Sequence, residues 1–277
     1  MPELPEVELA LRRILPGILG REIRDVTLCN SRVIRPLPAG SFLSAVRDRR
    51  IEGIRRRGKY LVFQLGPRPA APDLLLLHLG MSGRLEVVSP QGSRTRHAAA
   101  LFDLGDVGLA FEDVRQLGRI QLGGDALGSL GPEPLEKSFG PASLVRIAGN
   151  SRRGIKVCLM DQGCIAGLGN IYAAESLFRS RIHPAREARA LNRREWERLW
   201  RSIREVLTEA IERGVDESGR PGPRFYHRAP GVSADAGPTP VFQVYDREGR
   251  PCPACGEPVR RILQSGRSTY FCPGCQQ

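Results

Sequence analysis

Four cysteines near the C-terminus constrain the fold of this chain more than any other feature of its sequence. They form two C-x2-C pairs separated by sixteen residues, and they are Cys252, Cys255, Cys272 and Cys275. Two tight turns at this spacing can present four thiolates tetrahedrally to Zn²⁺. The sequence therefore predicts a zinc ribbon with one structural zinc ion. The residues between the pairs indicate a β-hairpin with its turn at Ser265-Gly266.

This ribbon allows two interpretations. The zinc can be a staple that only stabilises a small fold. Alternatively, the hairpin tip presents Arg267 to DNA. The nearby Arg260 and Arg261 suit a nucleic-acid surface, but they suit a solvated face equally well.

The net charge favours a polyanionic partner. Lys and Arg together number 42 and Asp and Glu 30, which gives a formal net charge of +12. Nucleic acid is the first candidate for such a basic chain, and its many arginines suit bidentate phosphate contacts.

The composition also bears on location. No apolar run approaches the roughly 20 residues that span a membrane. No basic segment leads into an apolar one at the N-terminus, so we expect no secretory signal and a cytoplasmic protein. An odd total of seven cysteines favours reduced thiols and a metal site over disulfides.

The first residues, MPELPEVELA, allow a chemical and a structural interpretation. If Met1 is removed, Pro2 supplies a secondary amine that can attack an aldehyde-like carbon and form an iminium. Glu3 could then donate or accept a proton. In the structural interpretation, Pro5 marks a first helical turn and Glu6 favours its positive end.

The apolar pattern changes from strands to helices along the chain. A helix is expected over Val7–Leu15, ended by Pro16-Gly17. Strands of a β-sandwich or barrel are expected at 61–65, 74–79, 84–88, 99–104, 107–111 and 119–122. A Gly- and Pro-rich linker follows at 124–141. Beyond it the periodicity is helical, most clearly in 192–214, where Trp196 and Trp200 are expected in the core.

Several stretches together carry a resemblance to a known family. They are MPELPEVE, RRRGKYLVFQL with Lys59, HLGMSGRL, GLGNIYAAESLF and the four-cysteine ribbon with Arg267. Over essentially its whole length the chain resembles the formamidopyrimidine-DNA glycosylase and endonuclease VIII family of DNA repair enzymes. The resemblance implies an α+β fold of two domains, in which an N-terminal helix accompanies a β-sandwich and a helical domain carries a helix–two-turn–helix motif and a zinc ribbon.

The resemblance also implies the domain boundaries. The N-terminal domain would cover residues 1–125 and a linker residues 126–140. The helical domain with a lesion-capping loop would cover 141–240, and the ribbon 241–277.

The family flips a damaged base out of duplex DNA, cleaves its glycosidic bond and cuts the backbone by β,δ-elimination. The resemblance implies that Pro2 forms a Schiff base at C1′, that Glu3 assists opening of the sugar, and that Glu6 supports the site. Lys59 and Arg267 would stabilise the departing phosphates.

A further set of residues matches the family's contacts with DNA. These are Met81, His97, Arg115, Leu117, Arg152, Lys156 and Asn170. Asn170 would grip the backbone at a helix N-terminus, with Lys156 and Arg152 on nearby phosphates. Met81 would fill the space of the extruded base, and Arg115 would read its orphaned partner.

Two regions depart from the family pattern. The loop that usually reads DPRRFG is DVRQLG here, so that Leu117 replaces an aromatic wedge. The lesion-capping region contains an unusual segment at 224–240. Both lie where the family chooses its base.

The leading hypothesis is a monomeric DNA glycosylase and β,δ-lyase that needs zinc but no organic cofactor. Its partner would be damaged double-stranded DNA, and its substrates oxidised purines such as 8-oxoguanine and formamidopyrimidines. One alternative is the same chemistry on oxidised pyrimidines, against which Met81 and Arg115 argue. Others are a non-catalytic damaged-DNA-binding protein and a zinc-ribbon protein that binds DNA by charge alone, neither of which needs Pro2 or Lys59.

Overall fold

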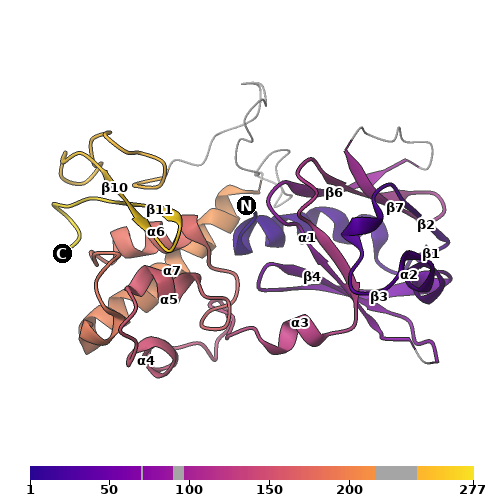
Figure 1. Ribbon diagram of the computed structural model, residues 1–277, viewed down its shortest axis with the longest axis horizontal. Coiled ribbons are helices and arrows are strands. Elements are labelled where there is room, and N and C mark those ends of the chain that lie inside the picture. Colours follow the sequence, from indigo (N-terminus) through magenta and orange to yellow (C-terminus); the bar gives the residue numbers. More distant parts are fainter. Residues whose placement is uncertain (70, 90–96, 216–241) are drawn as a thin grey trace. The chain divides into compact units, whose positions relative to one another are not determined.

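The computed structural model describes residues 1–69, 71–89, 97–215 and 242–277 (Figure 1). The chain divides into two compact units. Unit 1 comprises Met1–Gly128 together with Gly214 and Val215, and unit 2 comprises Ser129–Arg213 and the described residues from Phe242 to Gln277. The unusual segment 224–240 noted in the sequence lies outside the described residues.

Unit 1 is a β-sandwich of two antiparallel sheets. One sheet has the order β1-β3-β4-β5-β9 and the other β2-β7-β8-β6. Its strands are β1 (Glu22–Ile23), β2 (Asp25–Leu28), β3 (Arg49–Arg57), β4 (Tyr60–Leu65), β5 (Leu74–His78), β6 (Gly83–Val88), β7 (Ala98–Asp103), β8 (Gly108–Asp113) and β9 (Arg119–Leu122). The described part of unit 1 also contains the helical segments α2 (Ala39–Val46), α3 (Asp125–Gly128) and the 3-10 turn η1 (Ser31–Val33).

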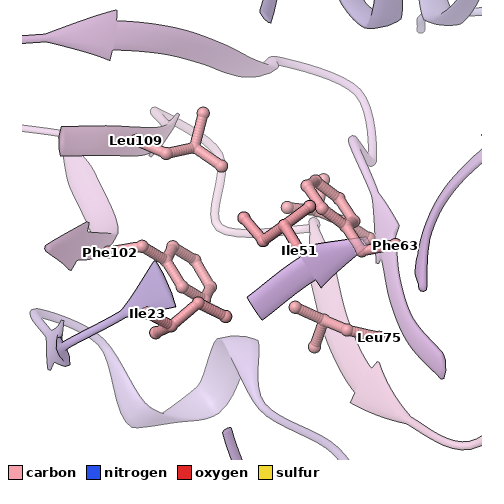
Figure 2. Close-up of a pocket in the computed structure, with 7 residues that line it drawn as sticks. Ile23, Ile51, Phe63, Leu75, Phe102 and Leu109 are labelled. Atoms are coloured by element: carbon pink, nitrogen blue, oxygen red, sulfur yellow. The ribbon is translucent and has the colours of Figure 1, made fainter. Parts of the chain in front are cut away.

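The core of unit 1 lies between the two sheets. Alternate residues of each strand point inward, so that Phe63 of β4 and Phe102 of β7 belong to one buried cluster. Figure 2 shows a small pocket within this core, lined by Ile23, Ile51, Phe63, Leu75, Leu77, Phe102 and Leu109. Because every lining side chain is apolar, the pocket offers no group that could orient a substrate or hold a water molecule.

Helix α1 (Leu4–Ile18) packs against β6, β3 and β4. It runs past the stop predicted at Pro16-Gly17 and ends at Ile18, two residues before Gly20, whose φ is +78°. Pro16 removes one intrahelical donor. The last turn is nevertheless kept, because Leu19 N–H donates to the Leu15 carbonyl at 3.1 Å and Ile18 is fully buried against the sandwich.

The chain returns to α1 directly after helix α7 (Arg193–Arg213). A Cβ atom at Gly214 would lie only 2.2 Å from Cδ1 of Leu9. The backbone at Gly214 therefore lies directly on α1, at a position where any larger residue would clash.

Unit 2 combines helices with a two-stranded ribbon. Its elements are α4 (Pro141–Ala148), α5 (Ile155–Met160), α6 (Asn170–Arg179), the 3-10 turn η2 (Ala188–Ala190), α7 (Arg193–Arg213), β10 (Arg260–Gln264) and β11 (Arg267–Phe271). Helix α7 packs on α6 and α4, and β11 packs on α6. Trp196 is buried as expected, whereas Trp200 is half-buried and donates its Nε1–H to the Phe139 carbonyl at 2.7 Å.

Part of the stretch expected to be a linker is attached to α7. Arg204 donates to the carbonyls of Pro134 and Glu136, at 2.8 and 3.0 Å. Residues from Ser129 onward accordingly belong to unit 2. The four domain boundaries expected from the sequence remain a prediction.

Among the described residues, no helix is both long enough and apolar enough to cross a membrane.

Candidate active site

The N-terminus of α1 concentrates buried acids at one point of unit 1. Glu3 is 1% exposed and Glu6 is 2% exposed. The Glu3 N–H donates to Oε2 of Glu6 at 2.7 Å, which is one half of a capping box. Both carboxylates lie at the positive end of the helix dipole, where negative charge is favoured.

The charges of four predicted site residues shift the pKa of the terminal amine. Burial lowers the pKa of the Met1 amine below its ordinary value. Lys59 and Arg115 lower this pKa further, whereas Glu3 and Glu6 raise it. A lowered amine pKa increases the neutral, nucleophilic fraction near pH 7. Met1 precedes the buried Pro2, so its amine stands in for the secondary amine that Pro2 would carry after removal of Met1.

Lys59 lies in the two-residue turn between β3 and β4 and is 6% exposed. The next residue, Tyr60, pairs across β4–β5 with His78, which the sequence left without a role. Burial, followed by the charges of Lys59 and Arg119, lowers the pKa of His78 to about 4. Its Nδ1 accepts the Gly80 N–H at 3.1 Å, so the neutral ring carries its proton on Nε2. A histidine two residues before the Gly-Met-Ser motif was the only signal in the sequence.

The loop from Asp113 to Gly118 presents Arg115 and Leu117 on a rigid frame. Asp113 is 2% exposed, and its carboxylate accepts the Ser82 hydroxyl and the Gly118 N–H, both at 2.6 Å. Leu117 is 46% exposed, and the nearby Met81 and Val114 are 40% and 52% exposed. These account for three of the four large hydrophobic side chains exposed in the described part of unit 1. Such a cluster is typical of a contact surface.

A second anchor of this loop involves a residue that departs from the family pattern. Gln116 has a φ of +54°, a conformation that non-glycine residues seldom adopt. Its Oε1 accepts a hydrogen bond from Asn30 Nδ2 at 3.0 Å. His97 is exposed, and its carbonyl accepts the Asp113 N–H at 2.9 Å.

In unit 2, Lys156 joins the start of α6 to the ribbon. It is 1% exposed, and its Nζ donates to Asn170 Oδ1 at 2.5 Å and to Thr269 Oγ1 at 2.7 Å. Asn170 Nδ2 donates in turn to the Ser268 carbonyl at 3.0 Å. The next residue toward the hairpin tip is the exposed Arg267. Lys156 thus supports two predicted DNA-contacting residues from beneath, and its own contact with phosphate remains a prediction. Arg152 is exposed.

The turn before α6 is shaped by one glutamine. Gln162 Oε1 accepts the Gly167 N–H at 2.9 Å, and its Nε2 donates to the Leu168 carbonyl at 2.6 Å. Gly167 has a φ of +90°, which explains a glycine there. This turn delivers Asn170 as the first residue of α6.

Glu175 is a further buried acid that the sequence did not identify. It lies on α6 at 6% exposure and accepts three successive backbone N–H groups, those of residues 243, 244 and 245, at 2.9–3.0 Å. Burial raises the pKa of Glu175, while the three hydrogen bonds lower it. Glu175 therefore holds the backbone of residues 243–245 against α6.

The four ribbon cysteines form a cluster suited to zinc. Their four Sγ atoms all lie within 4.8 Å of one another. Two Sγ pairs, Cys255–Cys272 and Cys252–Cys275, are 3.3 and 3.9 Å apart. A tetrahedron of ligands at 2.3 Å from Zn²⁺ has edges of about 3.8 Å, so the donor set fits one structural zinc. The predicted turn is also confirmed, since Gln264 pairs with Arg267 and Ser265 and Gly266 both have positive φ.

Comparison with known proteins gives three matches to family models. Residues 1–120 match the formamidopyrimidine-DNA glycosylase N-terminal domain, residues 130–220 the formamidopyrimidine-DNA glycosylase H2TH domain, and residues 249–277 a zinc finger found in FPG and IleRS.

Relatives and solved structures agree with these matches. The formamidopyrimidine-DNA glycosylase of Symbiobacterium thermophilum is 42% identical, over all of this chain and 89% of that protein. A Lactococcus lactis FPG mutant in complex with Fapy-dG containing DNA aligns over the full length of both chains, with 31% identity and a TM-score of 0.84. MutM in complex with carbocyclic 8-oxo-G containing DNA aligns equally completely, with 31% identity and a TM-score of 0.85.

Proposed function

The chain belongs to the formamidopyrimidine-DNA glycosylase family, and on this basis we propose that it excises oxidised purines from duplex DNA and then cleaves the abasic strand. The observation that carries the proposal is the setting of its terminal amine. A partly buried amine with a lowered pKa lies among two acids and two cations of the same unit. A protein that only binds DNA needs no such group.

Unit 1 supplies the chemistry at the sugar. Once Met1 has been removed, the Pro2 nitrogen attacks C1′ of the damaged nucleotide, and the base leaves as the C1′–N bond breaks. Glu3 protonates the ring oxygen as the sugar opens, which leaves an iminium between Pro2 and C1′. Glu6 keeps the first turn of α1 in place through its bond to the Glu3 N–H.

The iminium makes the C2′ proton acidic, so the 3′ phosphate can leave by β-elimination. A second elimination releases the 5′ phosphate. Both leaving groups are anions, and cations beside them lower the barrier to departure. Lys59 in unit 1 and Arg267 on the zinc hairpin of unit 2 take this role.

The preference for oxidised purines rests on the relatives. The two aligned complexes contain Fapy-dG and 8-oxo-G DNA. Here Met81 and Leu117 fill the gap left by the extruded base, and Arg115 pairs with the orphaned base. The remaining DNA contacts come from His97, Arg152, Lys156 and Asn170.

The enzyme acts as a monomer on damaged double-stranded DNA and carries one zinc ion. Its substrate is chromosomal DNA and its relatives are bacterial, which supports a cytoplasmic site of action at the nucleoid.

Borohydride trapping tests this proposal. Wild-type protein, Pro2→Gly and Glu3→Gln would each be incubated with duplexes that contain 8-oxoguanine, formamidopyrimidine, thymine glycol, dihydrouracil or an abasic site. The expected result is a covalent adduct that requires Pro2 and forms fastest with the oxidised purines. Glu3→Gln should trap on the abasic duplex but release intact bases slowly.

Other results would contradict particular parts of the proposal. Faster trapping with thymine glycol or dihydrouracil would move the specificity to pyrimidines. Trapping on the abasic duplex alone would leave a lyase whose lesion lies outside this set. No adduct from protein with Met1 removed and zinc bound would leave only a DNA-binding protein.

A further inference from the structure

The turn that carries Lys59 is a tight hairpin turn. Arg57 pairs with Tyr60, so Gly58 and Lys59 form the turn. Gly58 has a φ of +58°, as suits a two-residue hairpin turn with glycine first. Contacts between this turn and a neighbouring element help to fix the position of Lys59.

One arginine connects this turn to helix α1. Arg56 Nη1 donates to the Gly58 carbonyl at 3.2 Å, and Arg56 Nε donates to Glu8 Oε2 at 3.1 Å. The side chains of Arg56 and Glu8 are only 11% and 20% exposed. The rigid guanidinium fork lets one side chain hold both acceptors, and its hydrogen bond to Glu8 is charge-assisted.

Glu8 stands on the helix that also carries the catalytic acids. Glu3 caps α1 and Glu6 lies in its first turn, so Glu8 is only two residues further along the same rigid element. The other oxygen of Glu8, Oε1, accepts from Arg12 Nε at 2.9 Å, four residues on. One path from Glu3 to Lys59 thus runs through helix α1, the Glu8–Arg56 ion pair and the hydrogen bond from Arg56 to the Gly58 carbonyl, all within unit 1.

We propose that Glu8 and Arg56 are positioning residues that hold Lys59 in register with the terminal amine and Glu3. The inference rests on the proposed function, in which Lys59 stabilises departing phosphate. Neither residue touches the reacting atoms. Loss of this connection shifts the Lys59 turn relative to α1, so that elimination slows while the Schiff base still forms.

Arg56→Met and Arg56→Lys test the inference against a matched control, Arg47→Met. Arg47 also pairs with an acid of unit 1, Asp25, but both side chains are 53% exposed and neither contacts the turn. The measurements are the single-turnover rate of strand cleavage on an abasic duplex and the rate of borohydride trapping on the same duplex. Arg56→Met should slow cleavage about tenfold, since small misplacements of catalytic groups have effects of this order, and should change trapping far less. Arg56→Lys should also be slow, because an ammonium cannot span both acceptors, whereas Arg47→Met should match wild type.

A double-mutant cycle separates positioning from general destabilisation. If Arg56 acts through Lys59, Arg56→Met should cause no further loss of cleavage when Lys59 is already Met. An equal further loss in that background would overturn the inference. If Arg56→Met fails to fold, Glu8→Gln replaces it in the cycle, since it keeps the shape of the side chain and removes only the charge.

Different results would overturn the positioning role and the proposed function. Normal wild-type activity with equal cleavage rates for Arg56→Met and Arg47→Met would overturn the positioning role alone. A wild-type protein that forms no adduct with any duplex would overturn the proposed function and this role with it.

Discussion

At the scale of single residues, the main finding concerns His78, which lies beside Lys59 in the sandwich. Its ring centroid is 5.0 Å from that of Tyr60, and its pKa is lowered to about 4 by burial and by the charges of Lys59 and Arg119. The folded protein therefore keeps this ring neutral under conditions in which an unfolded chain would protonate it.

This predicts an acid-sensitive stability. Between the ordinary pKa of 6.5 and the folded value of about 4, the unfolded state binds more protons, so stability falls as pH falls through that window. The full loss is roughly 3 kcal/mol. Urea unfolding at several pH values should show this slope in the wild type, and His78→Gln, which cannot titrate, should flatten it. An unchanged slope in the variant would assign the effect to other groups.

Lys156 illustrates what a sequence conceals about a single side chain. The phosphate contact that the family resemblance implies requires an outward-facing cation, yet Lys156 is 1% exposed, with its ammonium bound to Asn170 and Thr269. A buried charge is tolerated when its hydrogen bonds are satisfied in this way. Its partner Thr269 stands 113 residues further along the chain, a pairing that no local pattern reveals.

At the scale of elements, the zinc ribbon makes the clearest prediction. Its two strands are too short to be stable alone, so the metal holds Arg267 in place. Chelation should unfold β10 and β11 and lower strand cleavage at least tenfold, with α6 and α7 retained. Zinc content, hydrogen exchange and cleavage would be measured together on wild type, Cys255→Ser and the control Cys29→Ser, whose exposed thiol lies outside the ribbon. Full cleavage by zinc-free protein would contradict the prediction.

The elements best predicted from sequence are those whose pattern is local. β9 matches its expected bounds of Arg119–Leu122, and the expected helical segment 192–214 contains α7, Arg193–Arg213. By contrast, β3 (Arg49–Arg57) is absent from the strands expected from the sequence. Contacts with distant segments accommodate its charges. Arg49 donates to the carbonyls of residues 65, 66 and 72, and Arg56 donates to the carboxylate of Glu8.

Some residues of the candidate site could likewise be predicted from the sequence, and others could not. Motifs indicated Pro2, Glu3, Lys59 and the cysteines, because each combines an unusual residue type with a fixed spacing. Glu175, Asp113 and His78 carry no such signal, since their importance comes from partners that folding supplies. The stretch before α4 is expected to be a linker because it is rich in glycine and proline, and the sequence does not reveal that Arg204 of α7 donates to two of its carbonyls.

At the scale of the whole molecule, the charge of +12 predicts strongly salt-dependent DNA binding. The logarithm of the association constant should fall linearly with the logarithm of salt concentration, and Arg267→Gln should make the slope shallower by about 1. Fluorescence anisotropy with a duplex that carries a stable abasic analogue would measure both slopes. Arg47→Gln, which removes an exposed charge already paired with Asp25, should leave the slope near that of wild type. Equal slopes for all three proteins would show that Arg267 does not contact phosphate.

The close packing of Gly214 against Leu9 has a consequence for folding during translation. Unit 1 begins with residue 1 but includes a residue synthesised only after all of α7. During translation the sandwich can therefore form while one face of α1 is still uncovered, and a fragment that ends at Gly128 would keep that face exposed. Helix α1 is therefore among the last parts of unit 1 to complete its packing.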